Sequence, residues 1–223
     1  MTESLGYYNR KFTKTTIVIH HTAGSHRPDW CIDSWKANKN KIGTSKVIGG
    51  KANTYKWGPV DEWDGVVVEY FDPKFWAMHL GIRESNYQIS KASIGIEICN
   101  YGQLIKNSKG QYLTYVNSLV PEDKVCTLST PFRGFTYFEA YTEKQILSLK
   151  AELLKLAEDF SIDLHSGLWS LVKRDFRPVQ NAFDYQAAAI SGKPGLWLHT
   201  NYRKADKWDC PPQPMLVDMI LSL

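Results

Sequence analysis

Apolar stretches with a two-residue period alternate along the chain with stretches of helical period, and this predicts a mixture of strands and helices. Apolar β-branched residues at 15–20 predict a buried strand that ends at His20. At 93–99 isoleucine occupies every second position, so Glu97 lies on the opposite face of that predicted strand. Segment 65–71 predicts a further strand. The carboxylate of Glu97 in the otherwise apolar strand 93–99 indicates either a functional role or a structural ion pair.

The helical patterns are clearest in two places. Segment 29–39 predicts a short helix that carries Trp30 and Trp35 toward the core. Thr142 and Gln145 have the spacing of a capping box, which predicts the start of a long helix. The apolar residues that follow share one helical face; they are Ile146, Leu149, Leu153, Leu156, Ala157 and Phe160.

Two long segments interrupt this regular pattern. Segments 102–141 and 166–194 lack strong periodicity and are rich in turn residues and aromatics, so we interpret both as insertions on a core scaffold. The C-terminal residues 215–223 predict a last amphipathic helical turn or two. At this length we expect residues 1–223 to form one catalytic domain.

Composition places the chain among globular proteins. Hydrophobic residues make up 43% and charged residues 22%, and the longest aliphatic runs are far too short to span a bilayer. The N-terminal stretch MTESLGYYNRKFTKT has no apolar core of the kind that a secretory signal requires. We therefore expect no stable membrane insertion, and a protein kept in the cytoplasm unless another factor releases it.

The net charge and the cysteine content exclude few further classes of protein. The net charge is +4 and the basic residues are interspersed, which favours an ordinary solvated surface and predicts no nucleic-acid partner. The cysteines, with no paired spacing, predict reduced and mostly buried thiols; they are Cys31, Cys99, Cys126 and Cys210.

The candidate chemistry lies at the two ends of the chain. In HTNYRKADKWDCPP, Lys207 and Asp209 follow His199 at spacings of eight and ten residues, and His20 closes an apolar run near the N-terminus. Two histidines and an aspartate would complete a three-ligand zinc site with a fourth position left for water. The alternative for each residue alone is an ordinary hydrogen-bonded or solvated polar side chain.

Five motifs come in an order that supports the zinc interpretation. They are IVIHHTAG at 17–24, FWAMHLG at 75–81, SIGIEI at 93–98, YTEKQ at 141–145 and the loop that begins at His199. With these motifs the chain resembles the zinc-dependent N-acetylmuramoyl-L-alanine amidases, a family that includes phage lysins and peptidoglycan recognition proteins. The resemblance extends over residues 15–212. It implies an α/β fold, in which helices flank a mixed central β-sheet and zinc lies at the rim of a groove.

The resemblance also assigns roles to residues. It implies that His20, His199 and Asp209 bind zinc, that Glu97 is the general base and acid, and that Lys207 faces the tetrahedral intermediate. Strand geometry agrees that only one of His20 and His21 can be a ligand of this metal, because neighbouring side chains on a strand point to opposite faces.

Further residues are assigned to the substrate side of the site. His79 follows a tryptophan-rich segment. In the family the matching histidine lies by the cleft and does not bind the metal, so the resemblance implies a position for His79 either at the rim or behind the ligands. Asn86 matches a position that contacts the substrate peptide in the family. We expect Trp76 and Arg203 to line the groove as well.

The chain departs from the family pattern in two places. Some members have a catalytic tyrosine after a glycine on the second strand, whereas here Gly43 is followed by Thr44, so more of the proton transfer falls on Glu97. The third-ligand motif usually reads aspartate then proline, but Cys210 intervenes before the proline here. If the backbone is extended up to that proline, Lys207 and Asp209 share a face and Cys210 points away.

The function that the resemblance implies is hydrolysis of the amide between N-acetylmuramic acid and L-alanine in peptidoglycan, with Zn2+ as cofactor. We expect a monomeric phage or prophage endolysin, released to the wall by a membrane-permeabilising partner of the holin type. The alternatives are a cytosolic amidase that recycles soluble muropeptides and a protein that binds peptidoglycan without cleaving it.

Overall fold

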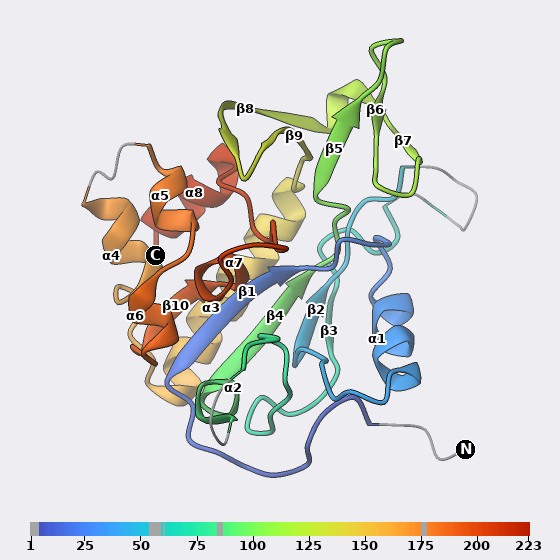
Figure 1. Cartoon of the computed structure of the whole chain (residues 1–223). Coiled ribbons are helices and arrows are strands. Elements are labelled where there is room, and N and C mark those ends of the chain that lie inside the picture. Colours follow the sequence, from blue (N-terminus) through green and yellow to red (C-terminus); the bar gives the residue numbers. More distant parts are fainter. Residues whose placement is uncertain (1–4, 54–58, 60, 84–86, 175–177) are drawn as a thin grey trace.

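A computed structural model describes residues 5–53, 59, 61–83, 87–174 and 178–223. Within these residues a five-stranded central sheet has the order β10-β1-β4-β2-β3 (Figure 1). Its strands are β1 (Thr16–His21), β2 (Lys46–Ile48), β3 (Val67–Glu69), β4 (Ser93–Ile98) and β10 (Gly195–Leu198). The strands predicted from the sequence at 15–20, 65–71 and 93–99 are thus present, with shorter or shifted ends.

Strand direction determines where side chains can gather. β1 pairs in parallel with both β4 and β10, β2 pairs in parallel with β4, and only the edge pair of β2 with β3 is antiparallel among the described strands. The carboxyl ends of four neighbouring strands therefore meet at one edge of the sheet. Open α/β sheets commonly bind ligands at this edge.

Helices cover both faces of the sheet, which confirms the expected α/β class. The helices are α1 (Pro28–Ala37), α2 (Gln88–Ala92), α3 (Glu143–Phe160), α4 (Leu168–Lys173), α5 (Gln180–Phe183), α6 (Ala187–Ile190), α7 (His199–Tyr202) and α8 (Pro214–Leu221). On one face, Ile17, Ile19 and the isoleucines of β4 form a core with α3 and α8. On the other face, Val18 packs with Trp197 and Tyr202, and Val47 packs with Ile32 and Trp35 of α1.

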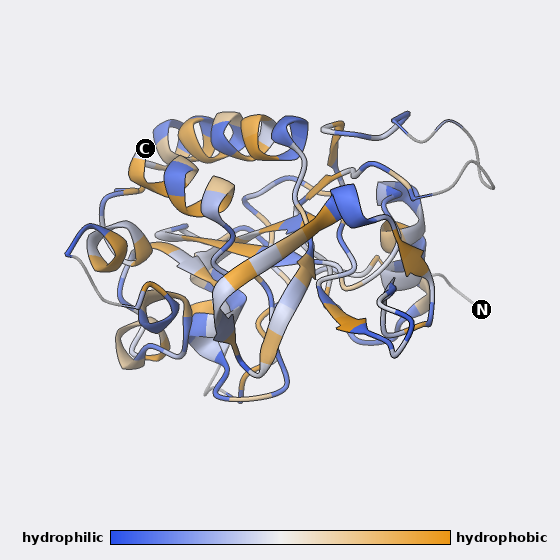
Figure 2. Ribbon diagram, turned by 90° about the horizontal axis from the view of Figure 1, so that it is seen from above, coloured by the Kyte–Doolittle hydropathy of each residue, from blue (hydrophilic) through white to orange (hydrophobic). Residues whose placement is uncertain are grey.

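The long helix α3 begins as its sequence predicts. The Thr142 hydroxyl accepts a hydrogen bond from the Gln145 N–H, and the Gln145 side chain accepts one from the Thr142 N–H. This capping box satisfies two N–H groups that the first turn of a helix leaves unpaired. The alternation of hydrophilic and hydrophobic colours along α3 shows that one side of the helix faces the core (Figure 2).

One prediction for α1 was wrong. Trp35 is buried, but Trp30 is 41% exposed. Residues five positions apart are separated by about 140° around a helix, so both indoles cannot face the same core.

The two segments without strong periodicity have defined structures. Segment 102–141 forms a second sheet of the order β7-β6-β5-β9-β8 in the described chain. Its elements are β5 (Gln103–Lys106), β6 (Tyr112–Leu113), β7 (Leu119–Val120), the 3-10 helix η3 (Glu122–Lys124), β8 (Val125–Phe132) and β9 (Phe135–Glu139). Segment 166–194 contains α4, α5 and α6. In the part of the chain that the structure describes, no helix has the length and apolar character needed to cross a membrane.

Candidate metal centre

His20 and His199 come together because their strands are neighbours. β1 and β10 pair in parallel with Ile19 opposite Leu198, so the next residue of each chain segment is a histidine at the carboxyl edge of the sheet. Both imidazoles are buried, and their Nδ1 atoms are 3.0 Å apart. Strand pairing thus brings together two histidines that are 179 positions apart in the sequence.

Asp209 completes the cluster from the loop after α7. The Asp209 carbonyl accepts a hydrogen bond from the Thr200 N–H, which folds the loop back onto the start of α7. Its Oδ2 lies 2.8 Å from His199 Nδ1 and 3.6 Å from His20 Nδ1. Among the described residues, these three form the group whose ligand atoms all lie within 4.8 Å of one another.

A chain of hydrogen bonds fixes which nitrogen of His20 faces this cluster. The Ser93 hydroxyl donates to the Ser90 carbonyl at 3.2 Å, so its oxygen accepts from His79 Nε2 at 2.8 Å. The neutral His79 then accepts, at Nδ1, a hydrogen bond from His20 Nε2 at 2.9 Å. His20 therefore carries its proton on Nε2 and presents the lone pair of Nδ1 to Asp209 and His199.

His199 is oriented in the same way by a backbone group. Its Nε2 lies 3.0 Å from the Leu80 carbonyl oxygen, which can only accept, so the proton of neutral His199 lies on Nε2. Its Nδ1 therefore also presents a lone pair to the cluster. A second hydrogen bond that fixes the tautomer is the usual arrangement of metal-binding histidines.

The donor set fits zinc. Two imidazole lone pairs and a carboxylate oxygen face one another at 2.8–3.6 Å, and a single cation between them satisfies all three. Ligands of a tetrahedral zinc site with bonds near 2.0–2.2 Å are separated by about 3.3 Å, which agrees with this spacing. Two histidines and one carboxylate also match a zinc site that keeps its fourth position open.

Burial and charge favour the unprotonated ligands. Burial and the neighbouring His199 lower the pKa of His20 to about 4, although Asp209 opposes this. Burial alone would raise the pKa of the Asp209 carboxyl, but positive charge at the neighbouring imidazoles, a role that a bound cation would fill, holds the pKa well below its usual range. Neutral imidazole and ionised carboxylate are the forms that bind metal.

Glu97 lies beside this cluster on β4. It is directly opposite His20 in the pairing of β4 with β1, and it is buried. Burial and the negative charge of Asp209 raise the pKa of the Glu97 carboxyl well above its usual range, while Lys207 and a hydrogen bond with the Thr44 side chain oppose the shift. Thr44, in the segment where some family members carry a tyrosine, is thus near enough to influence the carboxyl.

Lys207 and Cys210 leave the loop in different directions. The Lys207 ammonium is close enough to lower the pKa of both His20 and Glu97. Cys210 is fully buried in the core shared with α3 and α8, where Tyr141 is also buried. Burial raises the pKa of the Cys210 thiol well above its usual range, so it stays protonated. The structure therefore brings Asp209 to the histidines and keeps Cys210 away from them.

The residues predicted on the substrate side of the site lie in different surroundings in the structure. His79 lies behind His20, where both of its ring nitrogens are engaged, so it occupies the position behind the ligands that was one of its two predicted locations. Arg203 bridges the His199 loop to the loop at Gly81 by donating to the Gly81 carbonyl. Asn86 lies outside the described residues.

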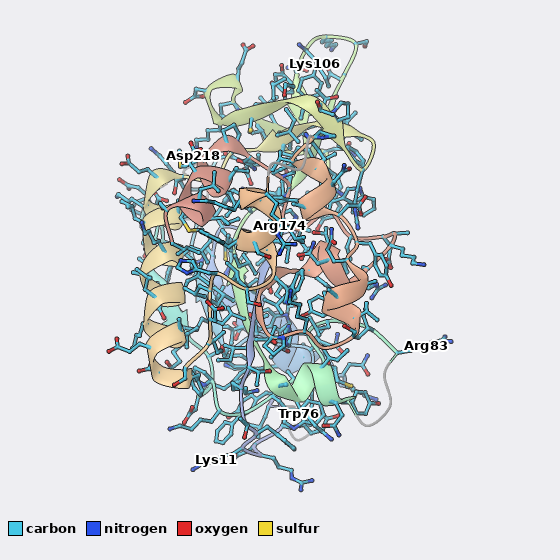
Figure 3. The ribbon with its side chains drawn as sticks, turned by 90° about the vertical axis from the view of Figure 1, so that its left-hand side faces the viewer. Lys11, Trp76, Arg83, Lys106, Arg174 and Asp218 are labelled. Carbon is cyan, nitrogen blue, oxygen red and sulfur yellow. The ribbon has the colours of Figure 1, made fainter. Side chains whose placement is uncertain are left out.

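Trp76 is not brought to the metal ligands. Its ring stacks on Tyr8 at 4.1 Å, meets Phe12 edge-on and lies near the Lys91 ammonium. Trp76 lies with Lys11 at one end of the molecule, opposite the end marked by Lys106 (Figure 3). Trp76, which the sequence predicts to line the groove, is thus buried among N-terminal residues.

Some residues around the ligands were missed at the sequence level. Ser93 and the Leu80 carbonyl fix the two histidine tautomers, yet neither has a sequence signal, because a serine at a strand start and a leucine carbonyl are common features. Thr44 was noted as a departure from the family pattern but was not connected to Glu97.

A buried His-His-Asp cluster with a carboxylate and an ammonium near it could hold a metal ion and has the residue types of a hydrolytic site. The chain belongs to the N-acetylmuramoyl-L-alanine amidase family, whose model matches residues 11–209. This match confirms the resemblance inferred from the motifs.

The solved structures that are similar to the chain include the following two. One is the amidase AmiD from E. coli in complex with anhydro-N-acetylmuramic acid-L-Ala-D-gamma-Glu-L-Lys; it is 19% identical, with 70% of this chain and 48% of that chain covered and a TM-score of 0.41. The other is AmpDH3 from Pseudomonas aeruginosa in complex with anhydromuramic pentapeptide. It is 16% identical, the match covers 81% of this chain and 65% of that chain, and the TM-score is 0.41. The chain thus spans less than two thirds of either relative. No curated protein matches the chain.

Proposed function

We propose that the protein is a zinc-dependent amidase that hydrolyses the bond between N-acetylmuramic acid and L-alanine in peptidoglycan. The observation that carries the proposal is the convergence of His20 Nδ1, His199 Nδ1 and Asp209 Oδ2, each with a lone pair toward the others. Membership of the amidase family supplies the bond that such a site would cleave.

The two histidines and Asp209 would hold the ion, and their buried surroundings exclude competing water from the ligand atoms. Bound there, zinc would lower the pKa of a water molecule toward neutrality and polarise the amide carbonyl. The chain's own residues then have to move a proton and stabilise charge.

Glu97 is the proposed proton carrier. Its side chain lies on the face of the sheet that carries His20, so it is beside the ligands without being one of them. A carboxylate there can accept the proton of the attacking water and donate it to the nitrogen of the leaving L-alanine. The Thr44 side chain lowers the pKa of this carboxyl and so supports its ionised form.

Lys207 is the proposed oxyanion partner. Its positive charge lowers the pKa of both His20 and Glu97, which supports a role close to the reacting groups. A fixed positive charge stabilises the negative oxygen that develops only in the transition state, and it therefore accelerates the reaction.

The proposed substrate is the polymeric wall, as for an endolysin. The net charge of +4 favours approach to an anionic wall polymer, in agreement with this setting. The same bond occurs in soluble muropeptides, so the two substrates have to be compared directly.

The test is digestion of purified sacculi and of soluble anhydromuropeptides by the same zinc-loaded preparation, followed by mass spectrometry of the products. We expect free stem peptides that begin with L-alanine, and faster release from sacculi. Release from soluble fragments alone would identify the recycling alternative. Binding to sacculi without any product would identify a non-catalytic binding protein, and His199→Ala is the inactive control.

A further inference from the structure

The hairpin of β8 and β9 ends directly on the loop that carries the metal ligand Asp209. Its two turn residues, Arg133 and Gly134, both have positive φ, 47° and 86°. Two-residue hairpin turns of this kind strongly favour Asn-Gly, since most other residues are strained there. Arginine in such a position indicates that its side chain has a use, and the contacts of that side chain show what the use is.

The Arg133 guanidinium donates hydrogen bonds to three backbone carbonyls of the His199–Asp209 loop. Nη1 lies 2.6 Å from the Lys207 oxygen, and Nη2 lies 3.0 Å from the Thr200 oxygen and 2.6 Å from the Arg203 oxygen. These carbonyls are spread along the loop between the two metal ligands. One planar group with several fixed donors thus determines the path of the loop.

The contact is reciprocal and its charge is balanced. The Trp208 indole N–H donates to the Arg133 carbonyl at 3.2 Å, and the Trp208 ring meets Phe135 edge-on at 5.8 Å. Asp184 lies 3.0 Å from Arg133 Nε, so the nearly buried guanidinium has an anionic partner. Without such a partner a buried charge would be unfavourable.

Arg133 and Asp184 come from different parts of the chain. Arg133 belongs to segment 102–141 and Asp184 to segment 166–194, the two segments that the sequence marks as insertions. The hairpin turns toward α5 and the C-terminal segments (Figure 1). The two segments therefore meet at the loop of the metal site.

We infer that Arg133, paired with Asp184, is a positioning residue that sets the geometry of Asp209 and Lys207. This inference rests on the proposed function of the metal site. The Lys207 carbonyl accepts one of the two shortest hydrogen bonds from the guanidinium to the loop, and Asp209 follows two residues later. Loss of the guanidinium would free the segment that carries the third ligand and the proposed oxyanion partner, while His20 and Glu97 on the sheet stay in place.

The experiment compares Arg133→Ala, Arg133→Lys and Asp184→Asn with the full-length wild type. Zinc affinity is measured by competition with a coloured chelator, and kcat and KM are measured on soluble muropeptide. For Arg133→Ala we expect zinc affinity and kcat to fall by about tenfold or more, with KM changed less, because outer partners of metal ligands have effects of this size. Arg133→Lys keeps the charge but cannot reach all three carbonyls, so we expect only partial rescue.

The control is Lys109→Ala, which removes an exposed cation from the turn of the same inserted sheet. We expect it to match wild type in zinc affinity and kcat. If Arg133→Ala does not fold, Arg133→Lys and Trp208→Phe, which removes the indole N–H donor but keeps an aromatic ring, carry the test. Cobalt-loaded variants provide a spectroscopic readout, since a displaced Asp209 changes the visible absorption bands.

The outcomes separate this inference from the proposed function. If wild type binds no zinc and releases no peptide, the proposed function fails. If wild type binds zinc and cleaves, but the folded Arg133 variants have wild-type zinc affinity, cobalt spectrum and kcat, then the positioning role is overturned and Arg133 only holds the hairpin.

Discussion

Glu97 lies directly beside His20 in the parallel pairing of β4 with β1, and both side chains are buried on the same face of the sheet. A proposed proton carrier and a proposed metal ligand are thus held by two central strands, not by loops. Rigid strands keep reacting groups at a fixed separation, which is a requirement for efficient proton transfer.

Substitution of Glu97 by glutamine tests its proposed role. The amide keeps the size and the contact with Thr44 but cannot accept a proton, so we expect zinc content and unfolding temperature near wild type and a loss of about a hundredfold or more in kcat. Metal analysis, thermal unfolding and muropeptide kinetics measure the three quantities. A variant that loses zinc would show that Glu97 supports the ligands, and one with normal turnover would remove it from the mechanism.

The choice between Asp209 and Cys210 as third ligand predicts a clear spectroscopic contrast. Since Cys210 is buried in the core beside Tyr141, we expect the cobalt-loaded protein to lack the intense near-ultraviolet band of a coordinated thiolate. We expect Cys210→Ser to bind zinc and turn over substrate, and Asp209→Ala to be depleted of metal. A thiolate band that disappears in Cys210→Ser would contradict the assignment.

The hydrogen-bond chain behind His20 predicts a role for Ser93 in metal affinity. Ser93→Ala removes the acceptor for His79 Nε2, so His79 no longer has a fixed tautomer and the lone pair of His20 is less firmly directed to the ligand cluster. We expect zinc affinity to fall by about ten- to a hundredfold. Competition with a chelator at neutral pH measures the change.

A matched control exists for this variant. The Ser170 hydroxyl also donates to a carbonyl three residues earlier, that of Gly167, but it has no histidine partner among the described contacts. Ser170→Ala is expected to keep wild-type zinc affinity. Equal effects of the two substitutions would show that Ser93 acts only through local folding.

The sequence predicts the ligands because the ends of strands are recognisable. His20 closes an apolar β-branched run, and neighbouring parallel strands bring their carboxyl ends together, so a ligand pair at this edge follows from pattern and topology. The amphipathic helix α3 and its capping box are equally local and were also found. Trp30 was misplaced because a short helix does not reveal which side faces the core.

The partners behind the ligands could not be predicted in this way. The contact of Arg133 with the Lys207 carbonyl depends on where a hairpin ends, and the sequence of segment 102–141 has no period that shows its strands. β8 is buried at only some positions, without regular alternation, because this second sheet is small and partly solvated. Contacts that depend on such a sheet can be seen only in the structure.

The buried carboxylate Glu139 predicts a pH dependence of stability. Burial alone would raise its pKa, but hydrogen bonds from His26, the Tyr101 N–H and Asn53 outweigh burial and lower the pKa below its usual range. A carboxyl whose pKa is lowered on folding stabilises the protein at pH values above its unfolded pKa of about 4.3. That contribution is lost as the pH falls through the lower, folded pKa.

We therefore expect Glu139→Gln to be less stable than wild type at pH 7, by on the order of 2 kcal/mol, because charged hydrogen bonds to a buried carboxylate are replaced by weaker ones. The difference between the two proteins should shrink as the pH falls below about 4.3, where the carboxyl protonates in the unfolded wild type, and through the lower pKa of the folded state. Urea unfolding at a series of pH values measures it, and Glu158→Gln, an exposed carboxylate on α3, is the control with little effect at any pH. A difference that stays constant from pH 7 to pH 3 would mean that Glu139 contributes through packing and not through its charge.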